Sequence, residues 1–470
     1  MTDPAEEAGP QAPATAGHTD TLSSSRAVSE RVPGASTRIR RLALPMTAGE
    51  IVGYLQMLAL VAMVGRMGGD ALYVRSLFVP LGMLFGALNS ALAVTAQVAC
   101  SISKGRNAPE KAFPIAVSMM KVWVALGTGL TVLVTACSPL LAAFFDVSAS
   151  ARPDFIRFLC WMSLVSLLGF GPAVCASALR AFGFVRQALV VSLSGAALEL
   201  GLVGALGLGA GMGMDSLPVA AAVTAVAGTL AGLWMLRRTG LSSAGQRSPW
   251  QPEVIGLIKS VGVPVALTIG VISLYSLAMI RVLSPFGSAT VSGFATASSV
   301  QSLVIMPGLV LGSAAAIVLN QQRGAGTYTS LGPTYAGAVR IAFGVYAVIA
   351  LVAWAGRDLI AQVMTDDPVV AEQAARYLAI VALTYVLQGP VLMALTLMEH
   401  VGGGQRALLL NIGYFGVNII AGYWASRAFD SPDGLYWAVA ASNLQGVVVL
   451  LIAASFMRTL ASKDDGAGTP

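Results

Sequence analysis

Two acidic residues, Glu50 and Glu199, lie inside long apolar stretches of the sequence. Ionisable residues are rare in membrane-spanning segments because burying a charge in lipid is costly, so those that occur usually face a cavity or bind a cation. At a rise of ~1.5 Å per residue, both acids fall near the middle of a predicted span. A buried carboxyl that meets water alternately on two sides can take up a proton on one side and release it on the other. These two residues therefore predict cation coupling, with Glu199 as the stronger candidate.

Neutral polar residues also lie within the apolar stretches. They are candidates to line a substrate or ion path, but hydrogen bonding between helices is the commoner reason for such residues in membrane spans. Lys121 and Arg75 are candidate partners of the acids, although both lie close enough to span ends to reach the interface. Glu399 and His400 fall near the end of another span, where we expect a solvated loop. The neutral candidates are Tyr54, Gln56, Asn89, Gln97, Gln301, Gln388, Asn411 and Asn418.

Enzymatic chemistry has little support in the sequence. There are two histidines, His18 and His400, so neither a zinc motif nor a nucleophile–histidine triad is readily assembled. The four cysteines show no C-x-x-C spacing, and the glycine-rich run at 207–213 lacks the Gly-Lys-Ser/Thr of a phosphate-binding loop. We therefore expect no catalytic residues, no metal site and no cofactor beyond a coupling proton or sodium ion.

The composition indicates that lipid surrounds these residues. Hydrophobic residues make up 56% of the chain and charged residues 11%, where a soluble domain would have about 25% charged. The mean hydropathy is +0.76. Apolar stretches of about the ~20 residues that cross a bilayer recur along the chain, which predicts an all-α integral membrane protein with about twelve transmembrane helices. The predicted spans are 42–64, 73–100, 113–144, 155–179, 187–209, 216–236, 254–283, 289–319, 334–363, 369–398, 407–426 and 434–457.

A repeat with a constant offset of 219 residues relates the two halves of the chain. Because each half contains an even number of spans, the halves share one orientation and are related by a pseudo-twofold axis along the membrane normal. Two lobes of this kind can rock about a central cavity, which favours transport over a bundle that is merely stable. The matching landmarks are Pro45 with Pro264, Gly68 with Gly287, Lys104 with Arg323, Arg157 with Arg376, and Gly183 with Gly402.

The repeat also predicts the domain organisation and an asymmetry between the lobes. Glu50 and Glu199 align with Ile269 and Asn418, which are not ionisable, so the coupling residues are confined to the first lobe. Pro45 removes a backbone hydrogen bond from the first span and is a candidate hinge. The predicted segments are a disordered cytoplasmic tail at 1–37, an N-lobe at 38–236 with six spans, a cytoplasmic linker at 237–253, a C-lobe at 254–458 with six spans, and a tail at 459–470.

The basic residues predict the orientation of the chain in the membrane. They gather in the N-terminal region and in alternate loops, such as 104–111, 180–186 and 237–247, and the positive-inside rule places these segments in the cytoplasm. The loops on the other side carry mostly acidic residues. We therefore expect a multi-pass protein of the cell membrane, inner or plasma, with both termini cytoplasmic. The net charge of +6 is scattered singly, so no nucleic-acid partner is expected.

Several short segments recur in a fixed order between residues 40 and 458. In the first half they are Leu42-Ala43-Leu44-Pro45, Val64-Gly65-Arg66-Met67-Gly68, Lys104-Gly105-Arg106 and Leu179-Arg180-Ala181-Phe182-Gly183. In the second half they are Gly262-Val263-Pro264, Ile305-Met306-Pro307-Gly308-Leu309 and Asn320-Gln321-Gln322-Arg323-Gly324-Ala325-Gly326. In order and spacing, these segments resemble the multidrug and toxic compound extrusion (MATE) family of cation-coupled exporters.

The residues that this resemblance implies for cation binding match only in part. Branches of the family that couple in the N-lobe have an aspartate in span 1 and an Asn-x-x-x-Asp pattern in span 5. The first position is Leu60 here, and the second pattern reads Gly195-x-x-x-Glu199. The span-7 glutamate of other branches corresponds to Ile272. Glu50 could replace the missing aspartate only if it faces the same cavity. With two lone carboxylates and no surrounding cage, protons are favoured over sodium.

The residues and the resemblance together predict a monomeric, proton-coupled antiporter. It would export small organic compounds, amphipathic or cationic, by alternating access of the two lobes, with Glu199 and Glu50 binding the proton. Two alternatives stay open. A lipid-linked saccharide flippase of the same superfamily should have more cationic residues lining its cavity, and a transporter-like receptor or scaffold should show no flux.

Overall fold

The computed structural model describes residues 34–68, 71–145, 147–242 and 248–462. Within these ranges all regular secondary structure is helical, and no strand is present. Helix α1 begins at Ala35, so most of the predicted N-terminal tail lies outside the described residues, as do residues 463–470 at the other end. Residues 243–247 of the predicted linker also lie outside them.

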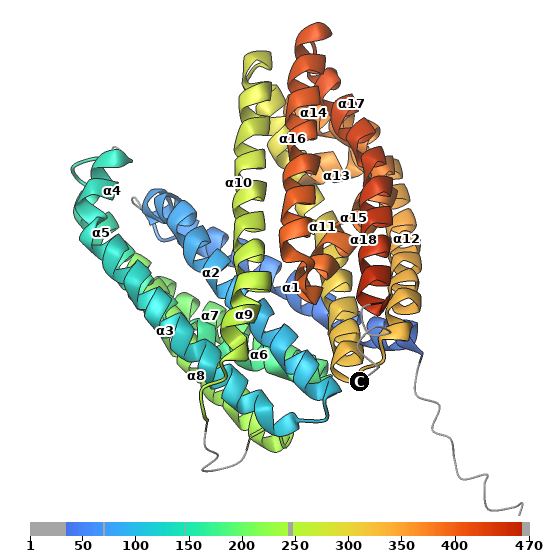
Figure 1. The fold of residues 1–470 in the computed structure, drawn as a ribbon. Coiled ribbons are helices and arrows are strands. Elements are labelled where there is room, and N and C mark those ends of the chain that lie inside the picture. Colours follow the sequence, from blue (N-terminus) through green and yellow to red (C-terminus); the bar gives the residue numbers. More distant parts are fainter. Residues whose placement is uncertain (1–33, 69–70, 146, 243–247, 463–470) are drawn as a thin grey trace, which may run out of the picture. The chain divides into compact units, whose positions relative to one another are not determined.

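The described residues of the first half of the chain, between 35 and 238, form eight α-helices, and Figure 1 shows how they are arranged. The fourth predicted span is built from α5 and α6, and the fifth continues from α7 into a π-helix, η2, at Val203–Gly209. The α-helices are α1 (Ala35–Gly65), α2 (Ala71–Gly105), α3 (Ala112–Ala136), α4 (Ser138–Phe144), α5 (Arg152–Ser166), α6 (Phe170–Phe182), α7 (Val185–Leu202) and α8 (Ser216–Arg238).

The second half, residues 253–462, contains ten α-helices and two π-helices. The π-helices are η4 (Ile258–Gly262) and η8 (Glu399–Gly403). The α-helices are α9 (Glu253–Leu257), α10 (Val263–Leu283), α11 (Ser288–Gly324), α12 (Leu331–Ala355), α13 (Arg357–Met364), α14 (Pro368–Val381), α15 (Tyr385–Met398), α16 (Gly404–Ala428), α17 (Pro432–Ser442) and α18 (Gly446–Ser462).

Eleven helical stretches among the described residues are long and apolar enough to cross a membrane. One of them, Pro368–Ala428, is 61 residues long and contains both the tenth and eleventh predicted spans. Its direction changes at Gly402, whose φ of 95° lies in the left-handed region that glycine adopts without strain. With this stretch counted as two spans, the predicted all-α fold of about twelve membrane helices is confirmed.

Helix boundaries repeat with the offset that the sequence predicts. Helix α2 ends at Gly105 and α11 at Gly324, which are 219 residues apart. The pair α3 and α12, and the starts of α4 and α13, keep the same offset. Gly183 and Gly402, with φ of 91° and 95°, stand before α7 and α16. The two halves therefore share one succession of helices and turns.

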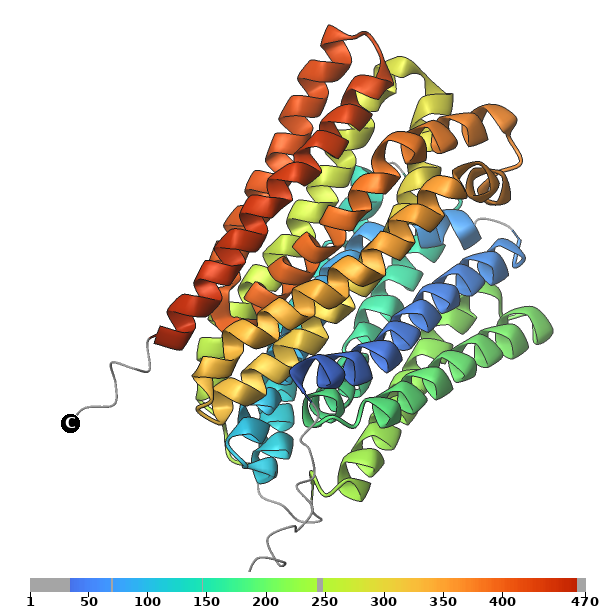
Figure 2. The same ribbon diagram turned by 90° about the vertical axis from the view of Figure 1, so that its right-hand side faces the viewer.

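The two halves meet through α1, α2, α10 and α11. Helix α1 packs against α7 of its own half and against α11 and α12 of the other, as Figure 2 shows, while α2 packs against α6, α10 and α11. We call the end at which α2, α6 and α11 finish, with Lys104, Arg180 and Arg323 in their last turns, the basic end.

Backbones of the two halves touch at the basic end. A Cβ atom added to Gly105 would lie 2.8 Å from the Cα of Gly324, so only glycine fits there. Nearby, the Gln321 amide donates to the Ala181 carbonyl oxygen at 2.7 Å, and Arg38 donates to the Gln321 side-chain oxygen. The contact between the halves is thus made by small residues and by hydrogen bonds.

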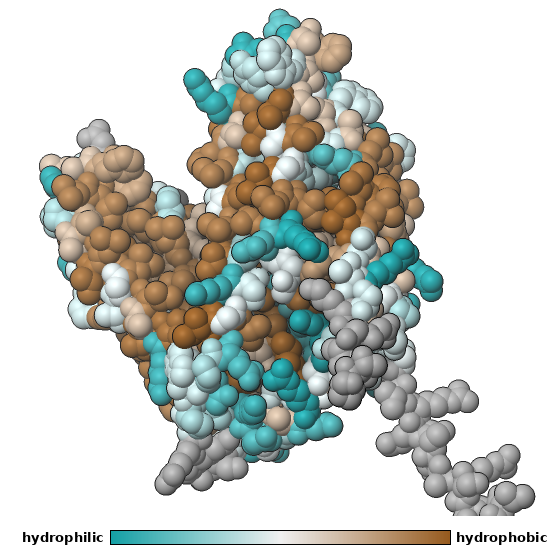
Figure 3. All heavy atoms as spheres, viewed as in Figure 1, coloured by the Kyte–Doolittle hydropathy of each residue, from teal (hydrophilic) through white to brown (hydrophobic). Residues whose placement is uncertain are grey.

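Apolar side chains cover the sides of the helices, whereas hydrophilic residues gather near the basic end, at the bottom of Figure 3. Leu44, Leu274 and Leu451 are 77%, 68% and 65% exposed. A surface this rich in exposed large apolar residues is unfavourable in water and suits contact with lipid.

Candidate functional site

The strongest candidate from the sequence, Glu199, is paired with a residue of another helix. Gln56 on α1 donates a hydrogen bond from Nε2 to a carboxylate oxygen of Glu199 on α7, at 2.8 Å. Both side chains are half-buried. Arg75, near the start of α2, interacts with Glu199 electrostatically but forms no ion pair within 4.0 Å among the described residues. Glu199 therefore keeps a polar partner without being neutralised by a close cation.

Glu199 lines a cavity of about 410 Å³ within the first half. The cavity lies among α1, α5, α6, α7 and α8, and Gly195, one turn from Glu199, also lines it. The Thr224 hydroxyl on α8 is buried without a hydrogen-bond partner in the described chain, so it can still bind water or a ligand. The polar lining residues are Gln56, Ser166, Arg180, Ser192, Glu199 and Thr224. A carboxylate, an amide and hydroxyls around a space of this size can hold a proton or a small cation with water.

Glu50 lies elsewhere on α1. It is exposed and is not among the residues that line this cavity. Gln56, the partner of Glu199, is six residues farther along α1, roughly 9 Å at the α-helical rise. Glu50 interacts electrostatically with Arg180, which does line the cavity. Glu50 thus lies at a different level of α1 from the Gln56–Glu199 hydrogen bond. Leu60, at the position of the family's span-1 aspartate, is half-buried.

Like Gln56, the candidates Gln97, Gln301 and Gln388 form side-chain hydrogen bonds that join helices. Gln97 on α2 is buried and donates to Ser313 on α11 at 2.8 Å, which links the two halves. In the second half, Tyr377 donates to Gln301 at 2.9 Å, and Gln301 approaches the buried Gln388 at 3.5 Å. These residues fasten α2 to α11, and α11 to α14 and α15.

The other neutral candidates divide into paired and unpaired side chains. Asn418 on α16 is buried, donates to the Tyr414 carbonyl oxygen at 2.9 Å and accepts from Ser442 of α17. Asn411 lies on the same helix and is discussed below. The side chains of Tyr54 and Asn89 are half-buried on α1 and α2, and hydrogen bonds to them do not occur within the described ranges. Pro45 lies inside the α-helix α1, and its repeat partner Pro264 lies just after the π-helix η4 within the helical stretch Glu253–Phe286.

The expectation of a solvated position for Glu399 and His400 is wrong. Their exposed fractions are 6% and 5%. Thr268 of α10 donates to a Glu399 carboxylate oxygen at 2.6 Å, and Asn411 of α16 donates to the same oxygen at 3.3 Å. The sequence placed Glu399 near a span end, but η8 turns inward at Gly402 and buries it. In the repeat, Glu399 aligns with Arg180, and this alignment is the feature of the sequence that could have indicated a functional position.

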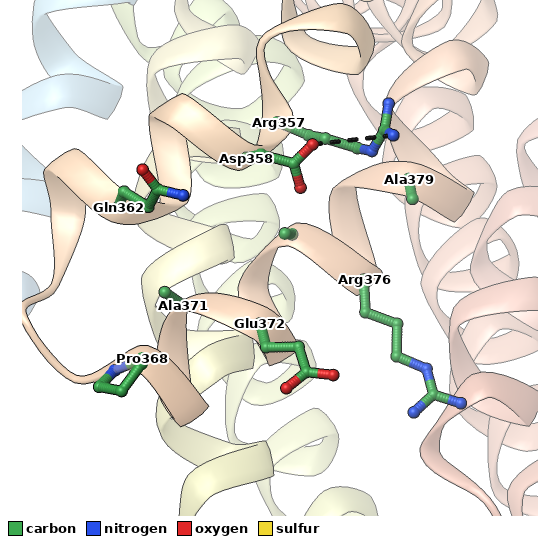
Figure 4. Close-up of a pocket in the computed structure, with 9 residues that line it drawn as sticks. Arg357, Asp358, Gln362, Pro368, Ala371, Glu372, Arg376 and Ala379 are labelled. Atoms are coloured by element: carbon green, nitrogen blue, oxygen red, sulfur yellow. Dashed lines mark ion pairs between the residues drawn. The ribbon is translucent and has the colours of Figure 1, made fainter.

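A second pocket lies at the end of the molecule opposite the basic end. Its volume is about 520 Å³, and α13 and α14 supply its charged lining (Figure 4). Arg357 pairs with Asp358 at 3.8 Å, and Arg376 pairs with Asp433 of α17 outside the pocket lining. The charges of the residues that line this pocket are therefore largely balanced by ion pairs. Groups of three or more His, Cys, Asp or Glu that could hold a metal ion do not occur among the described residues.

Known proteins of similar sequence and structure match most of this chain. The family model described as MatE matches residues 45–206 and 264–424, one match in each half. The multidrug resistance protein NorM of Burkholderia vietnamiensis is 28% identical over 449 residues, covering 87% of this chain and 91% of that protein. A probable NorM of Burkholderia pseudomallei is 27% identical over 441 residues, covering 87% of this chain and 90% of its own length. The crystal structure of the Vibrio cholerae MATE transporter VcmN in the bent form matches with a TM-score of 0.84 at 16% identity, covering 92% of this chain and 98% of that one.

Proposed function

Since the chain belongs to the multidrug and toxic compound extrusion (MatE) family of membrane transporters, we propose that it is a proton-coupled antiporter. It exports small organic compounds, amphipathic or cationic, by alternating access of two lobes, residues 38–236 and 254–458. The curated relatives are named multidrug resistance proteins, which supports an organic substrate of this kind. A single chain would suffice, with a small molecule and the bilayer as its partners.

The observation that carries this proposal is Glu199 in the cavity of the first half. Its partner Gln56 is an uncharged donor at 2.8 Å, so the carboxyl can change between its charged and neutral forms without breaking an ion pair. Protonation removes the negative charge and its attraction to Arg75. The relative positions of α1, α2 and α7 that are favoured before and after proton binding therefore differ, and this difference drives the change in access.

Direction of transport follows from the orientation that the basic residues predict. The basic end would face the cytoplasm, with both termini on that side, in the cell membrane. A proton entering from outside would bind Glu199 and favour release of substrate outward. In this scheme Glu50, beside Arg180, would act nearer the cytoplasmic side, and Pro45 would let α1 bend between the two states.

The lining of the cavity favours export of organic cations over the movement of anionic lipid-linked saccharides. Arg180 is the one basic residue among those that line it, while Glu199 supplies a carboxylate. A flippase for anionic head groups should present several cations to its ligand.

Efflux from proteoliposomes tests the proposal. Purified protein is reconstituted with a fluorescent cationic dye, and efflux is compared under imposed proton and sodium gradients. We expect the proton gradient to drive efflux and Glu199→Gln to abolish the driven component while insertion is unchanged. Glu253→Gln is the control, because this glutamate is exposed at the basic end, where it pairs with Arg106. Efflux by Glu199→Gln at the wild-type rate would refute the role of Glu199, and equal efflux without any gradient would refute coupling.

A further inference from the structure

Glu399 is a buried carboxyl that the proposed transport cycle does not use. It begins η8, and its side chain meets residues of two other elements, Thr268 on α10 and Asn411 on α16. Its exposed fraction of 6% is far below that of Glu199, which is half-buried beside a cavity. Three segments of the second half thus converge on one acidic group.

The partners of this carboxyl are uncharged. Both hydrogen bonds, at 2.6 Å from the Thr268 hydroxyl and at 3.3 Å from the Asn411 amide, reach the same carboxylate oxygen. Within the described ranges, Glu399 takes part in no ion pair. A lone carboxylate at such a site carries an uncompensated charge, which is far more costly to bury than the neutral acid.

Three charged side chains on elements packed against η8 are engaged with groups other than the carboxyl. Arg323 donates to the Val401 carbonyl oxygen at 2.8 Å, and Arg406 stacks over the Phe456 ring. Lys104 donates to the Phe182 carbonyl oxygen at 2.6 Å. At this end, the titratable groups of α2, η4, α11, α16 and η8 itself are Cys100, Lys104, Lys259, Arg323, Arg406 and His400, while α15, which also packs against η8, has Tyr385 at its far end.

A pocket at the basic end borders the residues that follow Glu399. It has a volume of about 540 Å³ and is lined by Val401, Gly402 and Gly403, which follow Glu399 within η8 and its terminus, and by Lys259 and Arg406. Because this pocket borders the residues that follow Glu399, it is the side from which the site would exchange a proton with water.

From this geometry we propose that Glu399, with Thr268 and Asn411, forms a proton-binding site in the second half, distinct from the Glu199 site. Proton binding adds one proton from water to the carboxylate and removes one buried negative charge, and release returns the proton to water. The inference goes beyond the proposed export, because protonation of Glu399 does not require substrate or flux.

A metal cation is a poorer ligand for this site. Thr268 and Asn411 both point hydrogens at the carboxylate, and the Asn411 amide nitrogen also donates to the Ala407 carbonyl oxygen at 3.1 Å. Hard cations require several oxygen ligands directed at one point. The arrangement suits a carboxyl that alternates between ionised and protonated forms.

The site lies where it can affect the contact between the halves. Both η4, which leads into α10, and η8 pack against α2 of the first half. A Cβ atom added to Gly262 at the end of η4 would lie 2.9 Å from the Thr95 hydroxyl on α2. Thr268 lies six residues after Gly262. Protonation of Glu399 changes the strength of its hydrogen bond with Thr268, and this change can affect the packing of η4 and α10 against α2 at the basic end.

Infrared difference spectroscopy of the purified full chain in lipid, between alkaline and acidic pH, tests the proposal. The stretching band of a protonated carboxyl is distinct from any histidine signal. We expect a carboxyl band that is lost in Glu399→Gln and retained in the exposed control Glu253→Gln. A spectrum of folded Glu399→Gln identical to that of the wild type would overturn the proposal.

A matched pair at Thr268 keeps the test decisive if Glu399→Gln does not fold. Thr268→Val removes the hydroxyl that donates to Glu399 and should move the band to higher frequency, whereas Thr268→Ser should leave it in place. No difference between the two variants would contradict the site. Loss of the band on adding sodium at constant pH would likewise contradict it, since a metal ion would then replace the proton.

The outcomes separate this inference from the proposed function. If the wild-type chain shows the Glu399 band but no proton-driven efflux, the export proposal fails and the proton site stands. If efflux is proton-driven and the spectrum of Glu399→Gln is unchanged, only the proton site fails.

Discussion

Equivalent positions in the two halves carry opposite charges. Arg180 and Glu399 are 219 residues apart, and each precedes by three residues a glycine with positive φ, Gly183 or Gly402. In the first half, Arg180 lines a cavity and interacts with Glu50. In the second half, Glu399 is enclosed by Thr268 and Asn411, and the repeat partner of Glu50 is Ile269.

This difference shows how one backbone arrangement serves two electrostatic purposes. In the first half Arg180 and Glu199 line one cavity and Glu50 interacts with Arg180, so acidic and basic groups offset one another. In the second half the acid has no basic partner within the described ion pairs, so its protonation state controls the local charge. The asymmetry predicted from the acids of the first half is therefore incomplete, because the second half has a buried acid of its own.

Exchanging the two arrangements should have the largest effect. Glu399→Arg copies the first-half residue into a site with no carboxylate partner, and an uncompensated buried charge costs about 3–5 kcal/mol. We expect the midpoint of thermal unfolding in detergent to fall strongly. Adding Ile269→Glu, which copies the Glu50–Arg180 pair, should recover part of the loss. If Glu399→Arg alone were as stable as the wild type, the Glu399 site would have to be open to water.

The prolines of the equivalent spans offer a second comparison. Pro45 interrupts the hydrogen bonding of the α-helix α1, at a cost of about 3 kcal/mol, whereas Pro264 follows a π-helical turn, η4, within the helical stretch Glu253–Phe286. Pro45→Ala should therefore stiffen α1 and lower the turnover of dye efflux, and Pro264→Ala measures the effect of the equivalent proline in the second half. Turnover that is unchanged in Pro45→Ala would argue against a hinge at this position.

The glycine contact at the basic end should give an intermediate effect. Gly105→Ala places a Cβ atom within 2.8 Å of Gly324, and overpacking of this kind costs about 1–3 kcal/mol. Gly86→Ala on the same helix is the control, because nothing lies within 4 Å of its added Cβ atom and helix propensity gains up to about 1 kcal/mol. The midpoints of thermal unfolding of the two variants measure the difference in their stability. This difference should disappear if the halves do not touch at Gly105.

The smallest effect is expected at an ion pair that the repeat does not share. Arg106 pairs with Glu253 at 3.3 Å, both side chains are at least half exposed, and the repeat partner of Arg106 is Ala325. Exposed pairs of this type contribute about 0–1 kcal/mol. Arg106→Ala should change the unfolding midpoint only slightly, and any larger change should vanish at high salt if its origin is electrostatic.

The sequence predicted the succession of helices well because apolar length and turn residues act locally. The constant offset between Gly183 and Gly402, for example, reappears as two turns of the same geometry. Partners across the chain could not be predicted in the same way. The Gln56–Glu199 bond joins residues 143 positions apart, and which faces of α1 and α7 meet depends on packing.

The position of a residue along its span does not predict well whether its side chain is buried. Glu399 was placed near a span end and expected to be solvated, but the π-helix and the turn at Gly402 fold it under α10 and α16. Glu50 was placed at mid-depth with Glu199, yet its side chain is exposed and outside the cavity. Sequence position gives the height of a residue on its helix and leaves the direction of its side chain undetermined.

The contact between Gly105 and Gly324 has a consequence for the symmetry of the molecule. These glycines are partners in the repeat, and a residue can touch its own counterpart only where the pseudo-twofold axis passes between them. The crossing of α2 and α11 therefore lies on this axis, and neither glycine can be replaced by a larger residue without the other half having to yield.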